Sequence, residues 1–191
     1  MTSRLLAALA LLLLWVGTAS AQILPGGTAP STHPGTRLNF PPSLGGAELE
    51  HSYTTPVGRD VHYVYQYVIN KVQITVFLFD NDRRVTAGSE SPMVTTQFTA
   101  ELDAAEKAMK ADGFTNFERP AVPSDCRYGS IAFRCIVYSA LAQRDRLFSK
   151  LLLTGYNGYF LKIRVDWSQG SGQTTADADR ALQAFVPALV K

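Results

Sequence analysis

The dipeptide Asn157-Gly158 constrains the fold of this chain more than any other feature of the sequence. A two-residue type I′ turn requires positive φ at both central positions, which Asn tolerates and Gly adopts freely. Apolar residues fill both flanking segments, so the dipeptide predicts a β-hairpin over residues 147–167. Counting outward from the turn places Phe148 opposite Trp167 and leaves one apolar face and one half-polar face. A shift of one residue would exchange the faces, so their contrast predicts the register.

Strands are predicted both before and after a central helix. Alternating or continuous runs of β-branched and aromatic residues mark the earlier strands at 47–55, 60–69 and 72–80. Further strands are predicted at 114–122 and 130–143, followed by the two strands of the hairpin.

Helices are predicted from capping residues and from apolar spacing. Ser91 caps the central helix, Pro92 fits its first turn, and Gly113 follows its end. A last helix begins after Thr174 or Thr175. Pro187 is expected to end or kink that helix one turn before the terminus.

The predicted order of elements is β-β-β-α-β-β-β-β-α. Short turns join most consecutive strands, which favours a mainly antiparallel sheet with the helices packed on it. The predicted fold class is α+β, in a single globular domain over residues 45–191.

The N-terminus carries the pattern of a signal peptide over residues 1–21. Arg4 precedes an apolar run, and Ala19-Ser20-Ala21 matches a cleavage site, so the mature chain is expected to start near Gln22. An uncleaved anchor is the alternative. Residues 22–44 are rich in Pro and Gly and are expected to form a flexible arm.

Charge and cysteine content agree with an exported chain. The formal net charge is +2, and loss of Arg4 leaves the mature chain close to neutral, without a basic field for nucleic acid. No stable membrane anchor is expected after cleavage. Cys126 and Cys135 are predicted to form a disulfide in the periplasm or outside the cell; redox or metal chemistry is the alternative.

No motif in the sequence indicates catalysis. The chain lacks the GxSxG, HExxH and GxxxxGK[ST] patterns, and its histidines and carboxylates show no metal-ligand spacing. We therefore expect a protein that is not an enzyme and needs no cofactor or metal. A hydrolase without a recognisable motif is the least favoured alternative.

The order of elements resembles that of the PsbP family, the extrinsic proteins of photosystem II and their exported bacterial relatives. The resemblance covers residues 45–191 and includes the hairpin turn at 156–162 and the last helix with Ala184-Phe185-Val186. It implies an α/β/α sandwich and, for bacterial members, a role as a binding, adaptor or assembly module. No position here matches the metal-binding residues of the plant proteins, and a photosynthetic role is not implied.

The leading hypothesis for function is an exported protein-interaction or assembly module with an unidentified exported protein partner. Its contact surface is expected on the half-polar hairpin face, at Phe160, Lys162 and Arg164, because aromatic residues and Arg are common interface anchors. The alternative for these residues is that they lie under a helix.

A second hypothesis is a carrier of a small apolar ligand. Aromatic-lined cavities with few polar groups suit apolar or planar ligands. The predicted pocket lies between a helix and the sheet and is lined by Tyr63, Tyr65, Tyr67, Phe77 and Phe79. A close-packed core is the alternative for these side chains.

Overall fold

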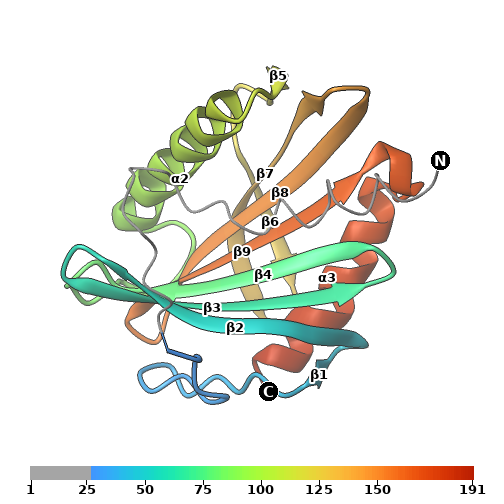
Figure 1. The fold of residues 1–191 in the computed structure, drawn as a ribbon. Coiled ribbons are helices and arrows are strands. Elements are labelled where there is room, and N and C mark those ends of the chain that lie inside the picture. The colour runs from blue at the N-terminus through green and yellow to red at the C-terminus, as the bar shows by residue number, and fades with distance from the viewer. Residues whose placement is uncertain (1–26) are drawn as a thin grey trace.

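A single antiparallel sheet organises the molecule (Figure 1). The computed structural model describes residues 27–191, so the predicted signal peptide lies outside the described residues. The strand order is β1-β2-β3-β4-β9-β8-β7-β5, and β6 pairs with β7. The strands are β1 (Ser43–Leu44), β2 (Ala47–Val57), β3 (Asp60–Ile69), β4 (Val72–Phe79), β5 (Thr115–Glu118), β6 (Ser124–Tyr128), β7 (Ile131–Ala142), β8 (Asp145–Tyr156) and β9 (Tyr159–Ser168).

The hairpin of β8 and β9 has the predicted register. Asn157 and Gly158 both have positive φ, at 49° and 88°. Phe148 lies opposite Trp167, and their rings stack with centroids 5.6 Å apart. Because β9 also pairs with β4, this hairpin joins the N-terminal and C-terminal halves of the sheet.

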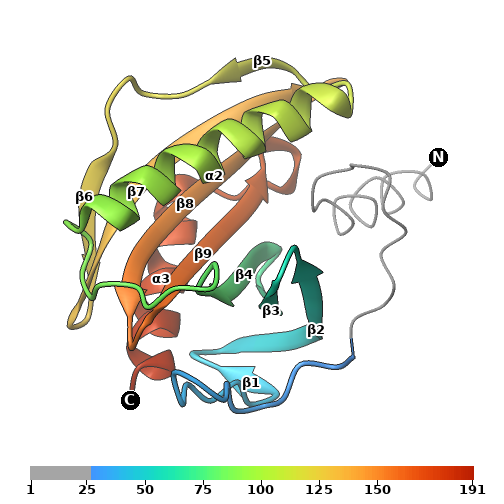
Figure 2. The ribbon, with the colours of Figure 1, turned by 90° about the vertical axis from the view of Figure 1, so that its left-hand side faces the viewer.

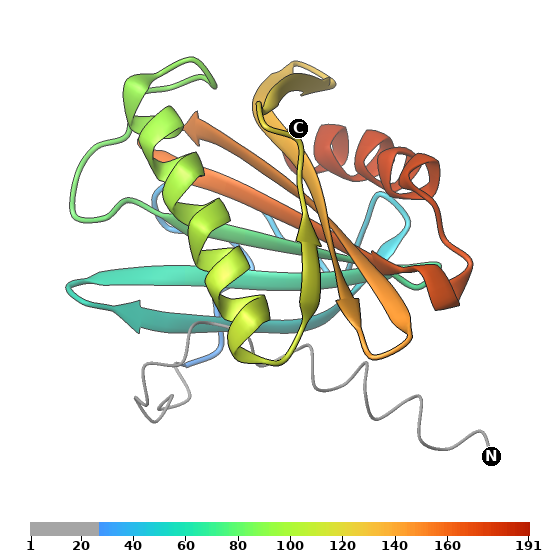
Figure 3. The same ribbon diagram turned by 90° about the horizontal axis from the view of Figure 1, so that it is seen from above.

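The two long helices cover opposite faces of the sheet, so the α+β class is confirmed (Figures 2 and 3). Helix α2 (Pro92–Ala111) starts at the predicted cap, where the Ser91 hydroxyl accepts from the Met93 amide. Helix α3 (Thr175–Leu189) follows a short 3₁₀ turn, η2 (Gln169–Ser171), and starts with a capping box at Thr174.

Pro187 does not end α3, so the expectation that the helix would end there is wrong. The helix continues to Leu189, and the Val190 amide still donates to the carbonyl of Val186. Burial of Val186 and Leu189 against the sheet stabilises the last turn even though Pro187 has no amide to donate.

The segment after α2 forms two short strands, where the sequence predicts one strand and a loop. Cys126 lies on β6, which reaches β7 through a tight turn at Gly129, where φ is 58°. The predicted disulfide is present between Cys126 and Cys135, whose Cα atoms are 6.0 Å apart. Antiparallel pairing across a tight turn brings the two cysteines together.

The predicted flexible arm is wrong for residues 29–44, which pack on the sheet. Phe40 is 1% exposed and its ring stacks on that of Tyr65, with centroids 3.5 Å apart. The hydroxyls of Tyr65 and Tyr67 donate to backbone carbonyls of this segment at 2.8 Å. Its few apolar residues are not enough to order it alone, but the aromatic face of β3 provides the surface that they need.

Replacement of Phe40 by Ala tests whether this segment belongs to the folded core. We expect Phe40→Ala to lower the free energy of unfolding by about 3 kcal/mol, because it removes a buried ring and leaves a cavity. Val122→Ala is the matched control, since Val122 is 74% exposed. Urea denaturation of the two variants gives the comparison, and equal midpoints would contradict the packing described.

His33 is buried within the same segment, between the rings of Tyr63 and Tyr159. Its Nδ1 accepts the Thr36 amide at 3.0 Å, and Nε2 has no hydrogen-bond partner among the described residues. A proton on Nδ1 would face an N–H donor, and burial lowers the pKa of His33 to about 4.

This environment predicts an acid-sensitive fold. Below the ordinary His pKa of 6.5 the unfolded chain binds a proton that folded His33 does not take up until the pH nears about 4. Stability should therefore fall as the pH drops through this window and level off below it. Thermal melting of wild type, His33→Gln and the control His51→Gln, at an exposed position, measures the effect. Only His33→Gln should flatten the pH profile, and an unchanged profile would rule out His33 as the cause.

Candidate functional site

A groove of about 540 Å³ lies between α2 and the sheet. Its floor comes from six strands, β2, β3, β4, β7, β8 and β9, and its roof from the C-terminal half of α2. The residues that line it include Thr55, Val57, His62, Val64, Lys71, Gln73, Phe77, Glu101, Ala104, Ala105, Ala108, Met109, Tyr138, Leu147, Ser149, Leu151, Lys162, Arg164 and Asp166. Most of these strand residues belong to the face of the sheet that α2 covers.

The change in residue size along α2 explains where the groove opens. Toward its N-terminus the helix packs Phe98 and Leu102 into the sheet, and both are buried. Farther along, the residues that face the groove include Ala105 and Ala108. Small side chains cannot fill the space above the sheet, so the helix and the sheet leave a hollow between them.

The floor of the groove is polar in its centre because β9 alternates. Lys162, Arg164 and Asp166 point to the α2 face, while the residues between them point to the α3 face. β9 lies between β4 and β8, so these charged side chains rise from the middle of the sheet. Buried charges need partners, and each of the three has one.

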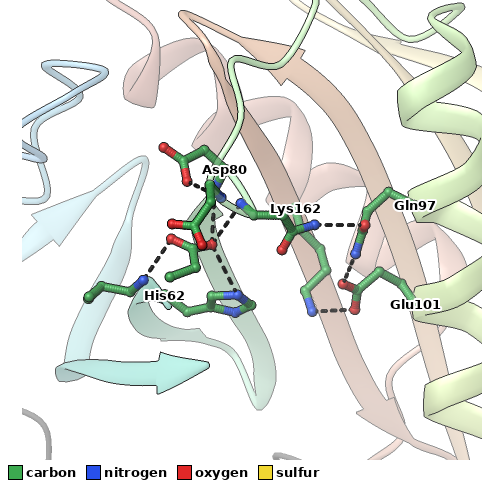
Figure 4. A network of polar contacts seen from close by, with 9 residues as sticks. His62, Asp80, Gln97, Glu101 and Lys162 are labelled. Atoms are coloured by element: carbon green, nitrogen blue, oxygen red, sulfur yellow. Dashed lines mark hydrogen bonds and ion pairs between the residues drawn. The ribbon is translucent and has the colours of Figure 1, made fainter. Parts of the chain in front are cut away.

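Lys162 is paired with α2 across the groove (Figure 4). Its Nζ donates to Oε2 of Glu101 at 2.7 Å and lies 3.9 Å from the centroid of the Phe77 ring. Gln97 donates to the other oxygen of Glu101 at 2.8 Å. Burial alone would raise the pKa of Glu101, but the ammonium group and these hydrogen bonds hold it below its usual value.

Arg164 and Asp166 form a second pair on the same strand. Nε of Arg164 donates to Oδ2 of Asp166 at 2.8 Å, and the Ser149 hydroxyl donates to Oδ1. Burial would lower the pKa of Arg164, but the carboxylate of Asp166 keeps it above its usual value. Arg164 therefore stays charged while its side chain is 25% exposed.

His62 lies at the rim of the groove, stacked on Phe79 with centroids 4.4 Å apart. Its Nε2 is 3.5 Å from Oδ2 of Asp60, and that carboxylate also accepts the Asn81 amide at 2.8 Å. Burial lowers the pKa of His62, although Asp60 acts in the opposite direction. Figure 4 shows His62 on the side of Lys162 away from Glu101.

The structure places the predicted interaction surface beneath α2. Phe160 is fully buried in the apolar cluster that contains Phe98 and Leu102, so it has no free surface to offer a partner protein. Lys162 and Arg164 line the groove instead. The sequence therefore groups these residues on one face correctly, and the alternative position under a helix is the one observed.

The five residues of the predicted aromatic pocket do not lie together. Tyr63, Tyr65 and Tyr67 face the layer of α3, whereas Phe77 and Phe79 face the layer of α2. The predicted pocket is wrong as a single site, because β3 and β4 present opposite alternation at these positions. Of the five residues, only Phe77 lines the groove.

Sequence reasoning missed several groove residues, including Glu101, Ser149 and Asp166. Asp166 and Ser149 oppose each other in the predicted hairpin register, and this pairing could have predicted a polar contact between them. Glu101 gave no such signal, since its pairing with Lys162 depends on how α2 crosses the sheet.

Within residues 27–191, no group of three or more His, Cys, Asp or Glu side chains is arranged to hold a metal ion. No helix in the same range is long and apolar enough to cross a membrane. The residues that line the groove present hydrogen-bond donors and apolar surface to a ligand.

The pairing of Glu101 with Lys162 is testable by substitution. Glu101→Gln leaves the buried ammonium group without a counter-charge and should cost about 3 kcal/mol of unfolding free energy at neutral pH. The loss should shrink as acid protonates wild-type Glu101, below the ordinary carboxyl pKa. Asp103→Asn on the same helix is the control, because that side chain is 61% exposed, and it should change stability by less than about 0.5 kcal/mol. Equal effects of the two substitutions, measured by urea denaturation, would contradict the assignment.

Comparison with known proteins matches the chain to none of them. No family model, curated protein or solved structure matches it. The resemblance to the PsbP family therefore stays a prediction from the order of elements, and the groove is interpreted from its own residues.

Proposed function

We propose that this protein binds a small, mainly apolar molecule in the groove between α2 and the sheet. The volume of about 540 Å³ falls within the range of small-molecule sites, about 300–1,000 Å³. The observation that carries the proposal is the alanine roof, which holds the hollow open over a polar floor. A few polar groups among apolar walls are typical of sites that orient one ligand.

The geometry favours this function over a protein-interaction module. Of the three residues expected to contact a partner protein, Phe160 is buried under α2, and Lys162 is paired with Glu101. A groove roofed by a helix admits a small molecule more readily than a flat protein surface. We further propose that the protein acts after export, in the periplasm or outside the cell, which the disulfide between Cys126 and Cys135 supports.

Filling the groove from its roof tests the proposal. Nile red, a neutral apolar dye whose fluorescence rises on leaving water, should bind the wild-type protein with a saturable signal. Ala108→Trp places a large ring in the groove and should weaken binding at least about tenfold, because the ligand and the ring compete for one volume.

Ala100→Trp is the matched control on the exposed side of the same helix and should bind the dye as wild type does. Thermal melting shows that both variants are folded. Equal dye affinity in the two tryptophan variants, or a wild-type protein that binds no dye, would overturn the groove as the site.

A further inference from the structure

We infer that the ligand of the groove is an amphipathic monocarboxylate whose carboxylate binds Arg164; the inference rests on the proposed function and specifies its ligand class. The evidence comes from how the charged groups of the groove use their hydrogen-bonding capacity. Two of those groups, Glu101 and Asp166, are acidic, and three, Lys71, Lys162 and Arg164, are basic.

Both acidic groups of the groove already accept hydrogen bonds on each oxygen. Glu101 accepts from Gln97 and Lys162, and Asp166 accepts from Ser149 and Arg164. A ligand that offered donors would have to compete with these contacts. The carboxylates of the groove therefore act to hold Lys162 and Arg164 in place.

Donor capacity remains on Arg164. Its Nε binds Asp166, but among residues 27–191 no acceptor forms a hydrogen bond with its two terminal nitrogens. These nitrogens form the flat end of the guanidinium fork, which matches the two oxygens of a carboxylate. Because the side chain lines the groove and is 25% exposed, a ligand can reach it.

The charge of the groove agrees with a single negative charge on the ligand. The basic lining residues Lys71, Lys162 and Arg164 exceed Glu101 and Asp166 by one positive charge. Lys71 is exposed at the rim, where it attracts an anion without being buried by it. A monocarboxylate neutralises this excess, whereas a phosphate monoester brings nearly twice the charge.

The apolar walls of the groove indicate the chemistry of the part of the ligand beyond its carboxylate. Val57, Val64, Phe77, Met109 and Leu151 surround the polar centre of the floor. An apolar body attached to the carboxylate buries these side chains, as a fatty acid or an aromatic acid would.

Competition against Nile red tests the ligand class. Decanoate and decanol share an apolar chain and differ in the head group, so the ratio of their affinities isolates the carboxylate contact. In wild type we expect decanoate to displace the dye at least about tenfold more effectively than decanol. The double variant Arg164→Gln/Asp166→Asn, which removes both charges without leaving an unpaired carboxylate, should lose this preference.

Arg180→Gln, at an exposed position on α3, is the control and should keep the preference. Arg164→Lys keeps the positive charge but lacks the paired terminal nitrogens of the guanidinium group. Its preference for decanoate should therefore lie between those of wild type and the double variant. This variant provides the test if the double variant does not fold. A wild type without preference, an undiminished preference in both Arg164 variants, or tighter binding of decyl phosphate would overturn the assignment while leaving the groove as the dye site. Absence of dye binding to wild type would overturn the proposed function itself.

Discussion

The alternation of residues along β9 explains both the apolar core on one side of the sheet and the groove on the other. β9 lies between β4 and β8 in the sheet, and α2 and α3 lie over the two faces of that sheet. One face carries the fully buried Leu161, Ile163 and Val165, and the other carries Lys162, Arg164 and Asp166. Apolar residues can pack against α3 without polar partners. Charged residues in the centre of a sheet need counter-charges or access to water.

Helix α2 meets this requirement in two ways. Near the middle of the helix, Glu101 supplies a carboxylate for Lys162, and farther along Ala105 and Ala108 leave Arg164 in contact with an open groove. Large apolar residues at those positions would bury Arg164 with only Asp166 to balance it. The groove therefore follows from the same alternation that makes β9 a strand, and the proposed carboxylate ligand accepts hydrogen bonds from the terminal nitrogens of Arg164.

The opposite face is closed by α3 and by residues 29–44, which run across the aromatic side of β3. The ring of Phe40 stacks on that of Tyr65 and so helps to cover this face of the sheet. One face of the sheet is therefore packed throughout, whereas the α2 face is packed around Phe98 and Leu102 and open at the groove. The tyrosines of β3 pack in the core for this reason, and the proposed ligand site lies on the opposite face, which carries Phe77.

The elements that have local sequence signals could be predicted from the residues alone. The Asn157-Gly158 turn, the β8–β9 register and the Ser91 cap each follow from neighbouring residues, because φ preferences, alternation and capping act over a few positions. Local patterns did not predict the docking of residues 29–44, the continuation of α3 through Pro187 or the pairing of Glu101 with Lys162. These features depend on contacts between residues far apart in the chain, and local sequence patterns do not predict the free energy of such contacts.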